Sequence, residues 1–336
     1  MTTTGDEAYH LYCNSRFGDL NSLSELERKS EASTAETVVS GAALVWLGYY
    51  AKALFYFHGN EEYDTKEGKE KAITLYTTIL PALKAAVAVE EEDESAPHLQ
   101  YLLGWYYHGT LGFGQENDKA CHLFRLAANQ GLAIAQSNLG LCYALGMGVP
   151  QDKAEAIRWY RLAANKGHAP AQYNLGIQCI QETPPNYSRA IPYFRQAADQ
   201  CFTSAQYMLG VMYCNGEGVN RDADMGCEFL QMAVTKGYAA AQHMLALCYQ
   251  NGNGVPLSYE DALRLFVLAA EQGLAQSQFA AGVYHEHGIG LINEENAHID
   301  PFIFHSLAAL VWLVWRAVCH PQLAHSLYRY TTKVCI

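Results

Sequence analysis

The sequence predicts an all-α protein, an α/α superhelix (solenoid) of helix-turn-helix repeats. Three observations predict this fold: apolar residues with helical spacing, glycine-rich turns between paired helices, and recurrence of the whole pattern at intervals of 34 or 36 residues. A two-helix unit of this length cannot bury its apolar stripes alone. The units must therefore pack on one another in sequence order.

The segment 132–167 shows the repeating unit most clearly. Its first helix carries apolar residues four apart on one face, Ala135, Leu139 and Tyr143. Gly146 and Gly148 are placed to end that helix, because glycine takes the left-handed C-cap conformation without steric cost. Asp152 is placed to start the second helix, which Gly167 ends.

Five columns of residues recur in register along the chain. The glutamine column is Gln100, Gln136, Gln172, Gln206, Gln242 and Gln278. The glycine column is Gly104, Gly140, Gly176, Gly210 and Gly282, with Ala246 in the remaining unit. A tyrosine near the end of the first helix, the turn glycines and a pair of small residues near the end of the second helix recur with them. Six copies at a fixed period indicate a solenoid.

The pattern A-Q-x-x-L-G-x-x-Y-x-x-G-x-G-V, followed by an alanine-rich helix, resembles the Sel1-like repeat, a relative of the tetratricopeptide repeats. The resemblance covers about 97–309, as six repeats at 97–131, 132–167, 168–201, 202–237, 238–273 and 274–309. It implies a superhelix that holds other proteins together. Secreted bacterial members carry a cysteine pair that bridges successive repeats, at the positions that Ala128 and Gln136 fill here. The absence of that pair favours a cytoplasmic protein.

Outside the repeats the sequence predicts three further segments. Residues 1–37 are polar and aperiodic, which predicts disorder or a frayed helix. Residues 38–96 predict a divergent helical hairpin that caps the array, with a kink at Pro81 and an acidic linker at 90–94. Residues 310–336 predict an apolar C-terminal cap and tail. The apolar segment from Phe302 to Val318 favours a buried cap, with self-association, a partner surface and membrane insertion as alternatives.

Composition and charge exclude several classes of partner. The formal net charge of −12 argues against nucleic acid and against anionic membrane surfaces. The N-terminus lacks the pattern of a signal peptide, and no stretch offers about 20 apolar residues for a spanning helix. The ten cysteines are then expected to be reduced. Cys214 and Cys227 lie in the two helices of one unit, and we expect no disulfide between them.

The sequence offers no catalytic, cofactor-binding or metal-binding set. The G-x-G pairs follow a helix rather than a strand and lack G-K-[ST], so we interpret them as helix caps. The histidines of His285-Glu286-His287 are two residues apart at a helix end, which favours a cap or plain surface over a metal site. No Ser-x-x-Lys with partners is present. The protein is expected to be no enzyme and to need no cofactor.

A stripe on the first helices is the candidate binding surface. Its positions correspond to 138, 142 and 145, beside the buried face centred on Leu139. By analogy with tetratricopeptide arrays this stripe would line a concave groove; the alternative is packing between repeats. The candidate partner-binding residues are Tyr106, Asn138, Cys142, Asn174, Gln178, Met208, Met212, Met244, Cys248 and Tyr284.

The sequence therefore predicts a cytoplasmic, non-enzymatic adaptor that binds a peptide or protein segment in a groove. The alternative is a regulatory repeat subunit or fragment of a larger enzyme complex of the kinase or ubiquitin ligase type. A hydrolase is a third hypothesis that the missing chemistry disfavours.

Overall fold

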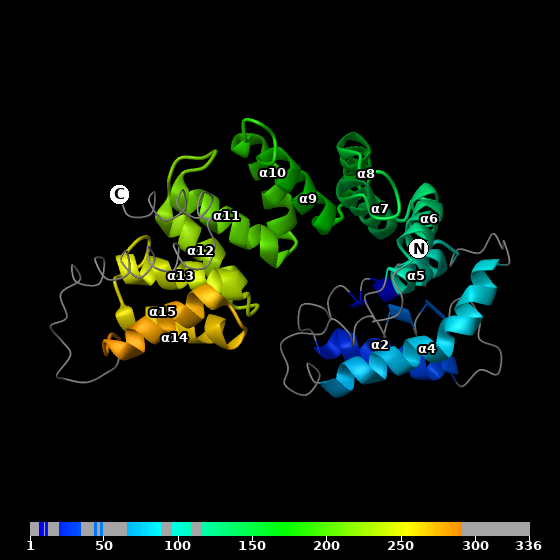
Figure 1. The fold of residues 1–336 in the computed structure, drawn as a ribbon, viewed down its shortest axis with the longest axis horizontal. Helices are drawn as coiled ribbons and strands as arrows, with labels where there is room; N and C mark the ends of the chain where they lie inside the picture. Colours follow the sequence, from blue (N-terminus) through cyan, green and yellow to red (C-terminus); the bar gives the residue numbers. More distant parts are fainter. Residues whose placement is uncertain are drawn as a thin grey trace. The chain divides into compact units, whose positions relative to one another are not determined.

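The computed structural model describes residues 7–9, 11–12, 20–34, 44–45, 48–49, 66–88, 96–108 and 116–290. Across these residues all regular secondary structure is α-helical, which confirms the all-α prediction (Figure 1). The helices are α2 (Leu20–Thr34), α4 (Lys66–Ala88), α5 (Ala96–Tyr107), α6 (Asn117–Asn129), α7 (Ala133–Leu145), α8 (Lys153–Asn165), α9 (Ala169–Ile180), α10 (Tyr187–Asp199), α11 (Thr203–Asn215), α12 (Ala223–Val234), α13 (Ala239–Asn251), α14 (Tyr259–Glu271) and α15 (Ala275–Glu286).

The chain divides into two units, 1–178 and 179–336. In the first unit α4 packs on α5, and α5 to α8 pack each on the next. In the second unit α10 to α15 also pack each on the next. Helices that pack in sequence order are what a repeat solenoid requires, so the predicted fold class is confirmed.

The glycine column lets the two helices of a repeat approach closely. A Cβ atom on Gly140 would lie 2.8 Å from the ring of Tyr160, which projects from α8. Gly104 meets the Phe124 ring at 2.9 Å, and Gly210 meets Leu230 at 2.7 Å, in the same way. Contacts under 3.0 Å would force the helices apart, so a side chain is excluded at these three glycines.

The glutamine column links successive repeats. The Nε2 atom of Gln136, on α7, donates a hydrogen bond of 3.1 Å to the carbonyl of Ala128, near the end of α6. Gln278 donates to the carbonyl of Ala270 at 3.2 Å, eight residues earlier as well. The last carbonyls of a helix have no partner within the helix. These two accept from the backbone of the following turn, at Gly131 and Gly273, and also from the glutamine of the next repeat.

The two turn glycines have different tasks. Gly146 is the left-handed C-cap of α7, with φ 69°, which confirms the helix-capping prediction for the first glycine. Gly148 has φ 67°, and a Cβ there would lie 2.2 Å from the carbonyl oxygen of Asn117, the first residue of α6. The second glycine therefore also lets the turn approach the second helix of the preceding repeat. Asp152 then caps α8, as predicted, and accepts hydrogen bonds from Ala154 and Glu155.

The N-terminal segments pack on the first repeat. Leu26 of α2 and Leu83 of α4 are fully buried, in one apolar core with Leu99 of α5. The hydroxyl of Tyr49 lies 2.9 Å from Nδ1 of His98, and both side chains are buried. Residues 20–34 form a helix, and its Leu26 belongs to this core. Its buried side is narrow and rich in serine, with Ser22, Leu26 and Ser30 four residues apart, which is why the apolar pattern is weak.

Two features depart from the regular repeat. α4 continues through Pro81 to Ala88. Cys201 occupies the position where Gly131, Gly167, Gly237 and Gly273 end the other second helices, and it adopts the same left-handed backbone, with φ 59°.

Four segments for which the sequence made predictions lie outside the described residues. They are the acidic run at 90–94, the second half of the last repeat, the segment 302–318 and the C-terminal tail. No helix in the described part of the chain is long and apolar enough to cross a membrane.

Candidate functional site

Four of the ten candidate residues are buried between helices. They occupy one repeat position and are at most 4% exposed: Cys142, Met212, Cys248 and Tyr284. Cys142 hydrogen-bonds Cys121 on α6, the second helix of the preceding repeat. Packing between repeats, the alternative interpretation of the stripe, therefore describes the surroundings of these four side chains, and a partner does not reach them in this structure.

The other six candidates are half-buried at the surface: Tyr106, Asn138, Asn174, Gln178, Met208 and Met244. Their chemistry differs between the two units. The first unit presents three amides and a tyrosine, whose ring packs edge-on against Tyr107 and lies 5.8 Å from Nζ of Lys84. The second unit presents the two methionines. The structure does not place the units relative to each other, so each surface stands by itself.

On α7 and α9 the accessible side of the first helix also includes a position that the predicted stripe lacked, the residue directly before position 142. On α7 it comprises Asn138, Leu141 and Leu145, of which Leu145 is 61% exposed. On α9 the equivalent residues are Asn174, Ile177 and Gln181. Spacings of three and seven residues keep these side chains on one helical face. Where position 141 and its equivalents are half-buried and aliphatic, at Leu141, Ile177, Leu247 and Val283, the accessible surface is more apolar than the predicted stripe.

A second accessible column lies on the second helices. Its members directly precede the pair of small residues and are 37 to 44% exposed: Leu126, Leu162, Met232 and Leu268. In the remaining repeat the position is held by Gln196. Single exposed apolar residues are ordinary on protein surfaces, but their recurrence at one repeat position is not expected by chance. Alignment of the repeats at the alanine pair would have found this column in the sequence.

Histidines near the end of the described chain are either exposed or packed against neighbouring side chains. Nδ1 of His287 lies 3.0 Å from the carbonyl of Val283 at the end of α15, and His285 and His287 are exposed. Burial of His243 against Phe266 and Ser277 lowers its pKa to about 4. In the described part of the chain, three or more histidine, cysteine or carboxylate side chains lie close enough to share a metal ion at one place, Cys214, Cys227 and Cys248.

Comparison with known proteins identifies the repeat. The family model described as Sel1 repeat matches residues 97–132, 133–168, 169–200, 203–238, 239–274 and 275–297, more than half of the chain. No curated protein shows a significant match. Sel1 repeat proteins are generally protein-interaction scaffolds and are typically non-catalytic.

Two solved structures are similar to this chain. A Sel1 repeat protein from Oxalobacter formigenes is 29% identical with a TM-score of 0.56, over 68% of this chain and 92% of that one. A protective antigen present in uropathogenic Escherichia coli strains, with an SLR fold, is 29% identical with a TM-score of 0.55, over 79% of this chain. The match spans about half, 52%, of that antigen. Consecutive repeat matches, the sequential packing of paired helices and these structural neighbours agree that the chain belongs to the Sel1 repeat family.

Proposed function

We propose that this protein is a non-enzymatic adaptor of the cytoplasm that binds a peptide or protein segment along the accessible side of its first helices. One observation carries the proposal. The recurring glutamines, glycines and alanines are used in packing between helices, whereas the accessible position of the first helices changes from Asn138 and Asn174 to Met208 and Met244. A constant scaffold with variable accessible side chains is the arrangement by which repeat proteins recognise partners.

The chemistry of these positions fits an extended segment. The amides of Asn138, Asn174 and Gln178 offer donors and acceptors to the backbone of a peptide in the first unit. Met208 and Met244 adapt to apolar side chains of different shapes in the second unit. The half-buried aliphatic neighbours, Leu141 and Leu247 among them, would add apolar area to such a contact.

Two further features support the proposed cytoplasmic localisation and the proposed absence of catalytic activity. The seven cysteines in the described residues are free thiols, which suits a reducing compartment. The family is typically non-catalytic, which supports an adaptor over a hydrolase. The alternative function, a regulatory subunit of a larger enzyme complex, would use the same binding surface. It would differ from the adaptor only in the protein to which the bound segment belongs.

Peptides selected from a random displayed library against the purified chain provide a probe for this surface. We expect the double variant Asn174→Ala and Gln178→Ala to weaken binding of the selected peptides by about 1–3 kcal/mol, because partner polar groups are left unpaired. The unfolding midpoint should change little, since both side chains are only half-buried. Leu139→Ala, which empties a fully buried position, should instead cost about 2–5 kcal/mol of stability.

Leu162→Ser is the matched surface control, because Leu162 is an accessible residue of the second helix in the neighbouring repeat. Retained binding by this variant, together with loss in the double variant, supports the first-helix surface. Loss of binding only in Leu162→Ser would move the interaction to the second-helix column and contradict the assignment. Unfolding of the double variant would mean that the two amides serve packing between helices.

A further inference from the structure

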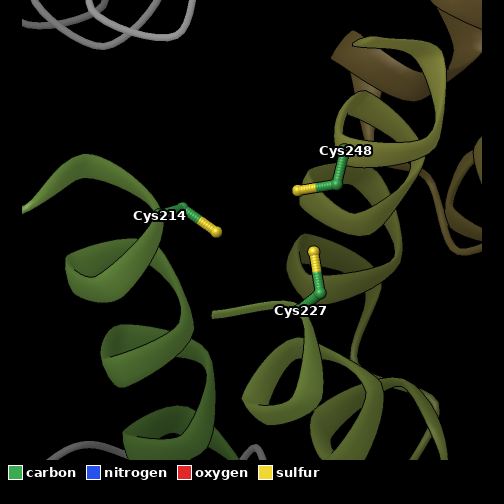
Figure 2. Close-up of side chains that lie close together, drawn as sticks. All are labelled: Cys214, Cys227 and Cys248. Carbon is green, nitrogen blue, oxygen red and sulfur yellow. The ribbon is translucent and has the colours of Figure 1, made fainter. Parts of the chain in front are cut away.

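Three buried cysteine side chains from three successive helices point toward one another in the second unit (Figure 2). Cys214 lies near the end of α11, Cys227 in α12 and Cys248 in α13. Their Sγ atoms all lie within 4.8 Å of one another, and each residue is 4% exposed. All three are free thiols. The adaptor function proposed above uses none of these sulfurs, so the cluster needs a separate explanation.

Two of the sulfurs occupy positions that the chain fills with cysteine twice. Cys227 and Cys248 are 21 residues apart, on a second helix and on the first helix of the next repeat. Cys121 and Cys142 hold the same two positions in the first unit, at the same spacing, and are hydrogen-bonded to each other. The repeat geometry therefore brings two thiols together at both places, and the second unit adds a third.

The third sulfur is accommodated by a matching change in the facing helix. A Cβ atom on Gly226 would lie 2.5 Å from Sγ of Cys214, and 2.9 Å from both the backbone nitrogen of Cys214 and the carbonyl oxygen of Gly210. The other described second helices carry alanine at the position of Gly226: Ala120, Ala156, Ala190 and Ala262. Glycine inside a helix costs about 0.5–1 kcal/mol relative to alanine. The glycine at 226 therefore lowers the stability of α12 at the point where it faces the third sulfur. Gly226 thus makes room both for Sγ of Cys214 and for the backbone of α11.

Hydrogen bonds and one guanidinium surround the three sulfurs. Cys214 accepts hydrogen bonds from Cys227 and Cys248, which lowers its pKa to about 4, with a further contribution from the Arg221 guanidinium. The same hydrogen bonds raise the pKa of Cys227 and of Cys248. Arg221 is held in place because it donates to the carbonyl of Cys214 at 3.0 Å and to Oδ1 of Asn253 at 2.8 Å. The carbonyl of Asn253 in turn accepts from Sγ of Cys227 at 3.2 Å.

We propose that Cys214, Cys227 and Cys248 form a three-sulfur site for one soft monovalent metal ion, Cu(I). Thiolates select soft ions, and Cu(I) is stable with three sulfur ligands. Three ligands around one ion at a bond length of about 2.3 Å lie about 4 Å apart, which requires only a small contraction of the observed cluster. Structural zinc takes four protein ligands, and no fourth histidine, cysteine or carboxylate joins this group in the described part of the chain.

Binding releases the remaining thiol protons to solvent and leaves the three thiolates with one cation. The site then carries two net negative charges, and the guanidinium of Arg221 offsets one of them. Burial of the three sulfurs excludes water from the open positions of the ion, which keeps the coordination at three. The ion would join α11, α12 and α13, so its binding should also raise the unfolding temperature of the chain.

Anaerobic titration of the reduced full chain with Cu(I), in competition with a chromophoric Cu(I) chelator, tests the site. We expect about one tightly bound Cu(I) per chain, with a sulfur-only shell by X-ray absorption. Cys214→Ala introduces the residue found at Ala144 in the second repeat and leaves Gly226 in place, so this variant should fold normally. Its Cu(I) affinity should fall at least about tenfold. Cys227→Ile, which introduces the residue found at Ile157, should weaken binding in the same way.

Cys121→Ile is the matched control, since it removes a cysteine from the equivalent two-thiol pair and should leave the Cu(I) affinity unchanged. Undiminished binding by the Cys214→Ala chain, with circular dichroism showing it folded, would overturn the proposal. So would equal losses in the control, or a chain that retains Zn(II) against a chelator while it yields Cu(I). Peptide binding by the adaptor surface is measured separately, so either proposal can fail without the other.

Discussion

Gly148→Ala tests whether the second turn glycine is required by the contact between repeats. Gly148 has φ 67°, a left-handed backbone that costs an alanine about 1–2 kcal/mol. The added Cβ would also lie 2.2 Å from the carbonyl oxygen of Asn117 and 2.7 Å from the amide nitrogen of Asp118. These are backbone atoms in the first turn of α6, which cannot move aside alone, and overpacking of this kind costs about 1–3 kcal/mol. The two terms together predict a loss of about 2–5 kcal/mol.

Gly167→Ala supplies the control, because it carries the backbone cost without the clash. Gly167 has φ 82°, but a Cβ there meets no atom within 4 Å. We expect a loss of about 1–2 kcal/mol, the left-handed conformational cost alone. The difference between the two variants, about 1–3 kcal/mol, then measures the close approach of neighbouring repeats. Gly254→Ala and Gly273→Ala repeat the comparison in the second unit, with a nearest distance of 2.2 Å for the former and no contact for the latter.

Urea denaturation followed by circular dichroism gives the free energies, with the slope checked because repeat arrays can depart from two-state unfolding. A larger loss in Gly148→Ala than in Gly167→Ala supports the inter-repeat contact. Equal losses would refute it, since helix capping would then account for the second glycine as completely as for the first.

Three further predictions concern single residues. Cys201→Gly should stabilise the chain by roughly 0.5–1 kcal/mol in the same assay, because glycine relieves the left-handed strain at φ 59° and loses some of this gain to its greater freedom when unfolded. Among the described cysteines a thiol reagent should label exposed Cys201 in the native protein and the buried six only after unfolding, as mass spectrometry would show. Burial lowers the pKa of His243 to about 4, so the unfolded chain gains a proton first as pH falls. Stability should therefore drop by roughly 2–3 kcal/mol between about pH 6.5 and 4, and His243→Gln should remove that dependence.

The repeat pattern could be predicted because its residues act within one or two neighbouring helices. The Gly140 column exists because two helices of one repeat touch there, and the Gln136 column because an amide reaches a carbonyl eight residues earlier. Because such short-range contacts recur from repeat to repeat, the same residue recurs at the interval of the repeat. A sequence with a fixed period therefore shows them directly.

Four residues of the candidate binding stripe are buried, which the sequence did not indicate because helical periodicity does not say how wide the buried face is. Position 142 lies about 60° from the centre of the buried face at Leu139, an angle that a narrow interface leaves exposed. In the structure α7 packs against both α6 and α8, so the buried face is wide enough to include Cys142. Position 141, which the sequence analysis did not choose, is accessible instead. The width of the buried face depends on how many helices pack against a given helix. The arrangement of the repeats sets that number, and the sequence of the single helix does not show it.

The three-cysteine cluster shows the same limit in another form. Cys214 and Cys227 could be paired from the sequence because they belong to one repeat, but Cys248 belongs to the next, and its contact with Cys227 depends on the packing of α12 against α13. The sequence did contain a sign of the contact between Cys227 and Cys248, because Cys121 and Cys142 are separated by the same 21 residues. A spacing that recurs between repeats reports a contact between repeats, just as a column reports a contact within one. In a solenoid, functional clusters across repeat boundaries are therefore to be sought in recurring spacings between different columns, together with complementary exceptions such as Gly226, where an alanine is lost to make room.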